Sequence, residues 1–232
     1  MTNRVAARVV GALFIMATVP FSLSIVVLEP VLGTADFLTS VSTSQGRVGA
    51  GVLLELVNHI AVVGIAVVIY PVLKPFSERL AVGYVAARSI EAALFAVATL
   101  HLLTLVFVSG EFVAAGEGAS AQFQILGDAL LAGHDWDNAA LPFTAFSIGA
   151  LLLNYALFRA RLVPRWIAVF GLLAASSILI ARILLMAGAE LPSSTVVVMD
   201  GPIFLQEMVF AVWLIWKGFN APGFRVDSQG TQ

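Results

Sequence analysis

The stretch from Glu55 to Glu91 reads ELVNHIAVVGIAVVIYPVLKPFSERLAVGYVAARSIE, and it decides the fold. Two apolar runs are joined by a short polar turn, and each run contains ionisable or amide side chains. Charged side chains are costly in the hydrocarbon of a membrane, so they usually face the interior of a helical bundle and pair there. The stretch therefore predicts a transmembrane hairpin whose inner face holds the functional residues.

The composition of the whole chain agrees with a membrane protein. Of its 232 residues, 60% are hydrophobic and 11% are charged, whereas about a quarter of a soluble domain is charged. Cysteine is absent, which excludes disulfides, thiolate catalysis and Cys-ligated metals. No phosphate loop or nucleotide fingerprint is present, so we expect no cofactor and no nucleic-acid partner. The oligomeric state stays open.

Six apolar runs are long enough to cross a membrane as helices. They cover residues 5–28, 48–73, 80–108, 140–158, 166–188 and 195–216. We expect the first run to be an uncleaved span, because no small-residue cleavage site closes it. The predicted fold class is an all-α, polytopic membrane bundle, with residues 1–219 as one membrane-embedded domain and 220–232 as a polar cytoplasmic tail.

Two connections between the predicted spans are long. Residues 33–45 form a loop rich in small and hydroxyl side chains, and residues 110–139 contain five acids around a short apolar patch, 123–131. The patch is too short to span, so it predicts an interfacial or re-entrant helix within this loop.

The distribution of Lys and Arg predicts the orientation. Nine basic residues fall in loops or tails on the side of the two termini: Arg4, Arg8, Lys74, Arg79, Arg159, Arg161, Arg165, Lys217 and Arg225. Arg47 is the one basic loop residue on the other side. Because basic residues near span ends stay in the cytoplasm, we expect cytoplasmic termini, an inner-membrane location and an outside loop at 110–139.

Four sequence blocks resemble the domain of unknown function 4386 family of bacterial multi-span membrane proteins. They are Glu55…Asn58; Tyr70-Pro71-Val72-Leu73 followed by Tyr84…Arg88…Glu91; Leu162-Val163-Pro164-Arg165-Trp166; and Glu207…Ala211-Val212-Trp213-Leu214-Ile215…Lys217-Gly218-Phe219. The blocks extend from the second span to the sixth. The resemblance implies a membrane location and a helical fold but no established activity.

Several ionisable side chains are predicted to lie near the middle of the bilayer. A helix rises about 1.5 Å per residue, which puts Glu55 about 11 Å below the outer boundary and Glu91 about 15 Å above the inner one in a core of about 30 Å. Residues of one helix that are three or four apart share a face. We therefore expect one cluster that carries any catalysis: Glu55, His59, Arg88, Glu91 and Glu207.

Four further polar residues are candidates for ligand binding. Asn58 and Asn154 lie well inside the second and fourth runs and could join the cluster. Arg182 and Asp200 come to similar depths on the last two spans, closer to the outer surface, so we expect them to pair.

The predicted cluster has three possible interpretations. It could be structural, with Arg88 neutralising one of the three carboxyls and the amides bridging helices. It could instead line a functional cavity, because three acids against one fixed cation leave a carboxyl that must be protonated, paired with protonated His59 or bound to a ligand. Glu55 and His59 also have a spacing that suits metal ligands. Arg88 would repel a cation, so we expect no metal.

The preferred functional hypothesis is a pocket for a membrane lipid or an apolar small molecule, with possible acid–base catalysis by a Glu and charge stabilisation by Arg88. The alternatives are a small proton-coupled transporter and a non-catalytic binding or scaffold protein. Transporters commonly show matching breaks in two repeats. The chain has one candidate break, at Asp200-Gly201-Pro202, and no visible repeat.

Overall fold

The computed structural model describes residues 3–115, 120–135 and 140–220, and this part of the chain is almost entirely helical. Six of its helices are long and apolar enough to cross a membrane, as the sequence predicts. They are α1 (Asn3–Leu32), α3 (Gln45–Leu73), α4 (Glu78–Ala115), α6 (Ala140–Ala160), α7 (Arg165–Met186) and α8 (Ser193–Trp216).

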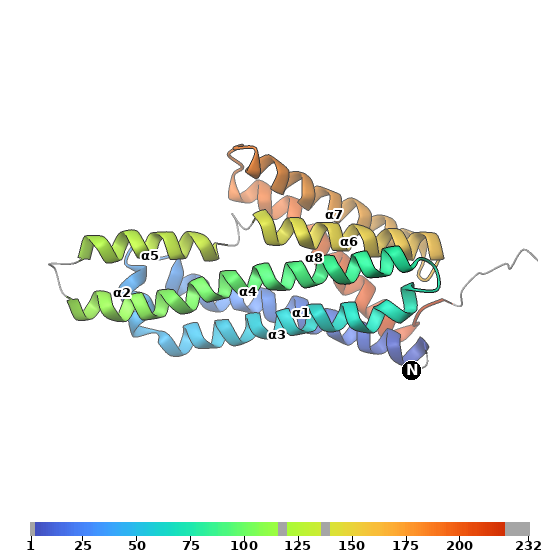
Figure 1. Cartoon of the computed structure of the whole chain (residues 1–232), viewed down its shortest axis with the longest axis horizontal. Coiled ribbons are helices and arrows are strands. Elements are labelled where there is room, and N and C mark those ends of the chain that lie inside the picture. Colours follow the sequence, from blue (N-terminus) through green and yellow to red (C-terminus); the bar gives the residue numbers. More distant parts are fainter. Residues whose placement is uncertain (1–2, 116–119, 136–139, 221–232) are drawn as a thin grey trace, which may run out of the picture.

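The six spanning helices form a closed ring in chain order. Each packs beside the next, and α8 completes the ring against α1. Figure 1 shows these helices running back and forth, roughly along the long axis of the molecule, which is horizontal in this view. Small residues allow close approach where helices meet: a Cβ added at Gly11 of α1 would lie 2.7 Å from the carbonyl oxygen of Ala211 on α8. Such contacts drive association of helices in lipid, where apolar burial alone gives no preference.

Two short helices lie at one end of the ring, which we call the α5 end. Helix α2 (Phe37–Thr43) occupies part of the connection that was predicted as a loop, and α5 (Ser120–His134) contains the predicted apolar patch. The predicted loop 110–139 is shorter than expected because α4 continues to Ala115. Helix α5 packs alongside α4 (Figure 1), and its placement relative to a lipid surface stays a prediction.

An apolar cluster explains why α2 and α5 fold against the spanning helices. Leu38 of α2 and Leu130 of α5 are buried with Leu102, Leu105 and Val108, which lie on the far part of α4. Burial of one leucine side chain contributes about 1.5–3 kcal/mol. The far part of α4 thus has an apolar face, which α2 and α5 bury.

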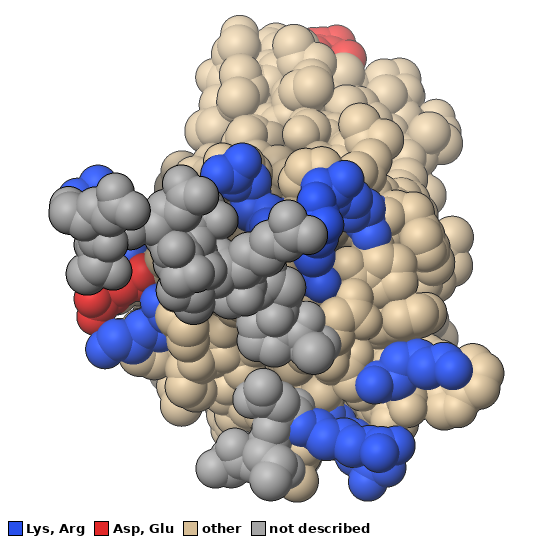
Figure 2. All heavy atoms as spheres, turned by 90° about the vertical axis from the view of Figure 1, so that its right-hand side faces the viewer, with Lys and Arg blue, Asp and Glu red and all other residues tan. Residues whose placement is uncertain are grey.

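The opposite end of the ring carries the N-terminus and most of the basic side chains, and we call it the basic end. Figure 2 shows Lys and Arg gathered over this face. Its exposed basic residues lie at helix ends and in the turns between them: Arg4, Arg8, Lys74, Arg79, Arg159, Arg161, Arg165 and Lys217. That distribution supports the predicted cytoplasmic orientation, which itself stays a prediction.

Local contacts hold the connections at the basic end. Lys74 Nζ lies 3.1 Å from Glu78 Oε1 across the α3–α4 turn, and the hydrogen bond to Glu78 raises the pKa of Lys74. Asn220 donates from its backbone nitrogen to Leu162 O and from Nδ2 to Arg161 O, at 2.8 and 3.0 Å. The predicted polar tail therefore begins with an anchored residue, and its remaining part, 221–232, lies outside the described residues.

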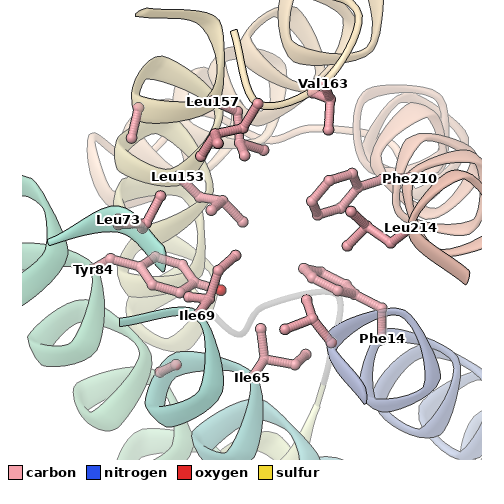
Figure 3. Close-up of a cluster of buried hydrophobic side chains, with 14 of the residues drawn as sticks. Phe14, Ile65, Ile69, Leu73, Tyr84, Leu153, Leu157, Val163, Phe210 and Leu214 are labelled. Atoms are coloured by element: carbon pink, nitrogen blue, oxygen red, sulfur yellow. The ribbon is translucent and has the colours of Figure 1, made fainter. Parts of the chain in front are cut away.

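The interior of the ring near the basic end is filled by apolar side chains (Figure 3). The labelled residues come from α1, α3, α4, α6, α8 and the α6–α7 turn: Phe14, Ile65, Ile69, Leu73, Tyr84, Leu153, Leu157, Val163, Phe210 and Leu214. Phe14 and Phe210 pack edge to face at 5.2 Å between ring centroids. This layer, which we call the apolar plug, closes the ring interior toward the basic end.

Candidate functional site

A small cavity inside the ring is lined by three of the ionisable residues of the spanning helices, Arg88, Glu91 and Glu207. We call it the axial chamber. Five of the six spanning helices line it, with α7 contributing no lining residue. The lining residues are Ala17, Thr18, Phe21, Asn58, Val62, Arg88, Glu91, Phe95, Phe143, Phe146, Ile203, Phe204 and Glu207.

Arg88 and Glu91 form a buried ion pair on one face of α4. Arg88 Nη1 donates to Glu91 Oε2 at 2.9 Å, and the two side chains are 3% and 2% exposed. The guanidinium lies over the ring of Phe146 on α6, 5.4 Å from its centroid. Gly149 makes this possible, because a Cβ there would lie 3.2 Å from Arg88 Cδ.

Glu207 of α8 supplies a second carboxyl to the axial chamber. Thr18 of α1 donates its hydroxyl to Glu207 Oε2 at 2.8 Å. Asn58 of α3 donates to Ala17 O at 2.9 Å and presents the rest of its amide to the cavity. The lining residues thus contain two carboxyls and one fixed cation, and a buried charge without a counter-charge is strongly disfavoured. The axial chamber therefore needs a proton or a bound cation to be neutral.

Two buried polar atoms beside the axial chamber lack a hydrogen-bond partner within the described residues. They are the Tyr84 hydroxyl and Arg88 Nε. Buried polar groups are rarely left unpaired, so each such atom calls for a water or a ligand. The axial chamber has a volume of 40 Å³, which is room for roughly three waters. A cavity of 10 Å³ lies beside it and is lined in part by Tyr84, Arg88 and Glu207.

Aromatic side chains separate the axial chamber from the α5 end. Phe21, Phe95 and Phe204 lie three or four residues toward the α5 end from the polar lining residue of their own helix, and Phe143 of α6 packs against Phe21 and Phe95. Phe21 is within 6.3 Å of the other three ring centroids, and Phe95 and Phe143 pack edge to face at 5.4 Å. We call these four residues the aromatic layer. The axial chamber thus lies between the aromatic layer and the apolar plug.

The prediction of one cluster of five residues was wrong for Glu55 and His59. Glu55 is fully buried, but its partners are Thr99, which donates to Oε2 at 2.6 Å, and His134, whose Nε2 lies 2.9 Å from Oε1. Thr99 is two helical turns from Glu91, about 12 Å along α4. The error arose because the span boundaries fixed the depth of each helix separately, whereas packing sets the register between them.

His59 lies between these two polar groups. Its ring stacks on Phe95 at 6.1 Å between centroids, and it borders a groove between α3 and α4 that also contains Ser89. Phe95 in turn lines the axial chamber. Within the described residues, no group of three or more His, Asp or Glu side chains is arranged to hold a metal.

The remaining predicted residues take separate positions. Asn154 donates to Ala150 O at 2.9 Å and faces Gln206 and Gly171, outside the axial chamber. Arg182 and Asp200 form an ion pair between α7 and α8, as predicted. The Arg182 guanidinium also lies 4.4 Å from the ring centroid of Phe143, so this pair covers the aromatic layer on its α5 side.

Three polar residues of these sites were not predicted. Thr18 and Thr99 lie inside apolar runs, where a threonine hydroxyl commonly bonds to its own helix, and nothing in the sequence marks them. His134 ends an apolar patch that the sequence placed in an outside loop. A signal for it does exist: it is the only ionisable residue at the end of that patch that can neutralise an acid of the bundle.

The comparisons identify a family. The model described as "Domain of unknown function (DUF4386)" matches residues 9–218, which include parts or all of the six spanning helices. The chain belongs to this family. No curated protein and no solved structure matches the chain.

Proposed function

We propose that this member of the DUF4386 family is a proton-exchanging membrane protein whose axial chamber binds the polar head of a small apolar or lipid-like molecule. The observation that carries the proposal is the charge count. Arg88 neutralises Glu91 at 2.9 Å, and within the described part of the chain the neutral hydroxyl of Thr18 is the one hydrogen-bond donor to Glu207. A proton or a ligand must therefore complete the site.

The surroundings of Glu207 support a ligand with an apolar body. The aromatic layer gives the axial chamber an apolar wall. The Tyr84 hydroxyl of the adjoining cavity and Arg88 Nε, which have no hydrogen-bond partner among the described residues, offer hydrogen bonds to a polar head. The present volume of 40 Å³ accepts only that head, because ligand pockets for whole small molecules measure roughly 300–1,000 Å³. Binding of the body then requires the aromatic layer to move.

Proton-coupled transport is the form of this function that the closed ends favour. The apolar plug and the aromatic layer separate the axial chamber from both ends of the bundle, which is the occluded arrangement that a carrier passes through. Acid–base catalysis on the bound molecule is the second candidate. It is favoured by Arg88, which stands beside both carboxyls and would stabilise negative charge that develops on a substrate.

Labelling with an apolar carbodiimide tests the proposal, because this reagent modifies protonated carboxyls in apolar surroundings. In membrane vesicles, Glu207 should be modified, the rate should rise in acid, and Glu207→Gln should lose the label. Glu190→Gln is the matched control, since Glu190 is exposed in the α7–α8 connection, and it should label like the wild type.

Ligand protection completes the test. Small aromatic and amphipathic compounds are screened for those that raise the thermal unfolding temperature of the purified protein. A compound that binds the axial chamber should also slow labelling of Glu207 and should not stabilise Glu207→Gln. A protein that is neither labelled at Glu207 nor stabilised by any compound would have a purely structural chamber, and the proposal would be wrong.

A further inference from the structure

A second buried group of ionisable residues lies between the axial chamber and the α5 end. Glu55 of α3 is its centre: Thr99 of α4 donates a hydrogen bond to it, and Nε2 of His134 on α5 lies within hydrogen-bond distance of its Oε1. All three side chains are buried.

His134 connects this group to an open vestibule. The vestibule has a volume of 450 Å³ and lies between the end of α1 and α5. Among the described residues that line it, three bear carboxyls, Glu29, Asp128 and Asp135, and none is Lys or Arg. A concave surface of one charge sign concentrates ions of the opposite sign. The vestibule therefore favours protons and small cations over anions.

His59 continues the series toward the axial chamber. It lies one helical turn from Glu55, so the two side chains share a face of α3, and its ring stacks on Phe95. Along α4, Thr99, Phe95 and Glu91 follow each other at intervals of four residues. Three successive levels result, each about 6 Å apart: Glu55 with Thr99, His59 with Phe95, and Arg88 with Glu91.

We propose that His134, Glu55 and His59 form the path by which protons reach the axial chamber from the compartment that the α5 end faces. This inference rests on the proposed function, because only a chamber that exchanges protons needs such a path. Imidazole suits the two outer positions, since one ring nitrogen can accept a proton while the other donates one.

Each transfer moves one proton and no electrons. His134 takes up a proton at Nδ1 from the carboxyls of the vestibule and gives its Nε2 proton to Glu55 Oε1, so the ring returns to the neutral form. Glu55 then passes a proton one turn along α3 to His59, through a water or a rotation of the side chain, and His59 releases it on the side of Phe95. The last step crosses the aromatic layer, so it requires the Phe95 ring to move and admit a water that carries the proton on to Glu91 and Glu207.

Three other ionisable residues lie near the α5 end, and their contacts or exposure place them beside the path and not in it. His101 of α4 packs against Gly133, beside His134. Arg47 of α3 donates from Nε to Val27 O at 2.9 Å, and Asp36 is exposed before α2. Neither Arg47 nor Asp36 lines the vestibule. The described carboxyls that line the vestibule together with His134 are those of Glu29 on α1, Asp128 on α5 and Asp135, which follows α5.

Carbodiimide labelling under a pH gradient tests the path. Spheroplasts expose the α5 end to the medium if the predicted orientation holds. With the internal pH held constant, acidifying the medium should raise the labelling rate of Glu207 several-fold in the wild type. Glu55→Gln and His134→Gln should abolish the response to external pH and leave only the response to internal pH. Asp36→Asn, which removes an exposed carboxyl at the same end, should respond like the wild type.

A second variant guards against a folding defect. Glu55→Gln changes a fully buried group, so its thermal unfolding temperature is measured first. His59→Phe keeps a ring on Phe95 but has no transferable proton, and it should fold normally and still lose the response to external pH.

The two proposals fail in different ways. If Glu207 is labelled at the same rate in the wild type and in His59→Phe at every external pH, the proposed path is wrong. The proposal of a proton-exchanging chamber then still stands. Glu207 that never labels overturns the chamber. The same mass spectra also measure the labelling of Glu55. If the labelling rate of Glu55 does not depend on external pH, the proposed path is wrong, irrespective of the result for Glu207.

Discussion

Replacing Arg88 should be one of the most damaging single changes in the bundle. Its guanidinium bonds Glu91 at 2.9 Å, lies over Phe146 and is 3% exposed. Arg88→Met fills a similar volume with apolar atoms but leaves the carboxyls of Glu91 and Glu207 in one cavity without a cation. Breaking a buried ion pair by removing one partner costs about 3–5 kcal/mol. We expect a loss of this size in the free energy of unfolding at neutral pH.

The loss in the free energy of unfolding on Arg88→Met should depend on whether Glu91 is charged and on pH. Glu91→Gln removes the partner charge, so the double variant Arg88→Met with Glu91→Gln should cost less than the sum of the two single variants, by roughly 0.5–3 kcal/mol. In acid, the two carboxyls of Arg88→Met can bind protons in the folded state, which removes their repulsion. A folded state that binds more protons than the unfolded one loses stability as pH rises, so this variant should be less destabilised in acid than in alkali.

Unfolding in mixed detergent micelles measures these differences, with helix content as the signal. Arg79→Met is the matched control, because Arg79 is exposed on the first turn of the same helix, and exposed substitutions usually change stability by no more than about 0.5 kcal/mol. Additive costs in the double variant, or parallel pH profiles for the wild type and Arg88→Met, would refute the assigned pairing of Arg88 with the carboxyls of the axial chamber.

Three further predictions follow from other contacts. Arg182→Ala and Asp200→Ala should each destabilise, and because the two residues form an ion pair, the double variant should cost less than their sum in the same unfolding assay; additivity would show that they act independently. Gly171→Ala should lower the free energy of unfolding by about 1–3 kcal/mol, because its Cβ would overlap the Asn154 amide. Gly49→Ala is the control: it has open space around it and should be neutral or stabilising by up to about 1 kcal/mol. Equal effects of the two substitutions would contradict the close packing of α6 on α7. Cysteines introduced singly at Gln45 and Pro75, near the two ends of α3, should react with an impermeant thiol reagent from opposite sides of an intact membrane, Gln45 from outside; equal labelling from one side would refute the six-span topology.

The fold could be predicted because its determinants are local in the sequence. Each spanning helix is an uninterrupted apolar run, and the connections carry the charges, so the number of spans and the basic end follow from composition along the chain. The pair on α4 was equally accessible, since Arg88 and Glu91 are three residues apart and must share a face. Arg182 and Asp200 were predictable because both lie near the same connection, which leaves little freedom in their relative depth.

The division of the polar residues into two groups could not be predicted in the same way. Helix α4 has 38 residues, about 57 Å of helix, whereas a membrane core of about 30 Å needs only 20 residues or so. An apolar run of this length can slide against its neighbour without exposing polar groups, so hydropathy does not fix which residue of α4 faces Glu55. The hydroxyl of Thr99 and the packing of Leu102, Leu105 and Val108 against α2 and α5 fix that register instead.

The position of Glu55 explains why α5 belongs to the bundle. Within the ring, Thr99 gives Glu55 a hydrogen bond but no counter-charge, and the fixed cation Arg88 lies about three turns from Thr99 along α4, where it pairs with Glu91. A fully buried carboxylate in that situation is unstable unless it is protonated or meets a positive group. His134 reaches Glu55 Oε1 from the end of α5, and it can supply either a positive charge or a neutral N–H. A ring without α5 would leave Glu55 with the Thr99 hydroxyl as its hydrogen-bond donor, whereas α5 adds an imidazole that can match either charge state of the carboxyl. That match is what the proposed proton path from the α5 end requires.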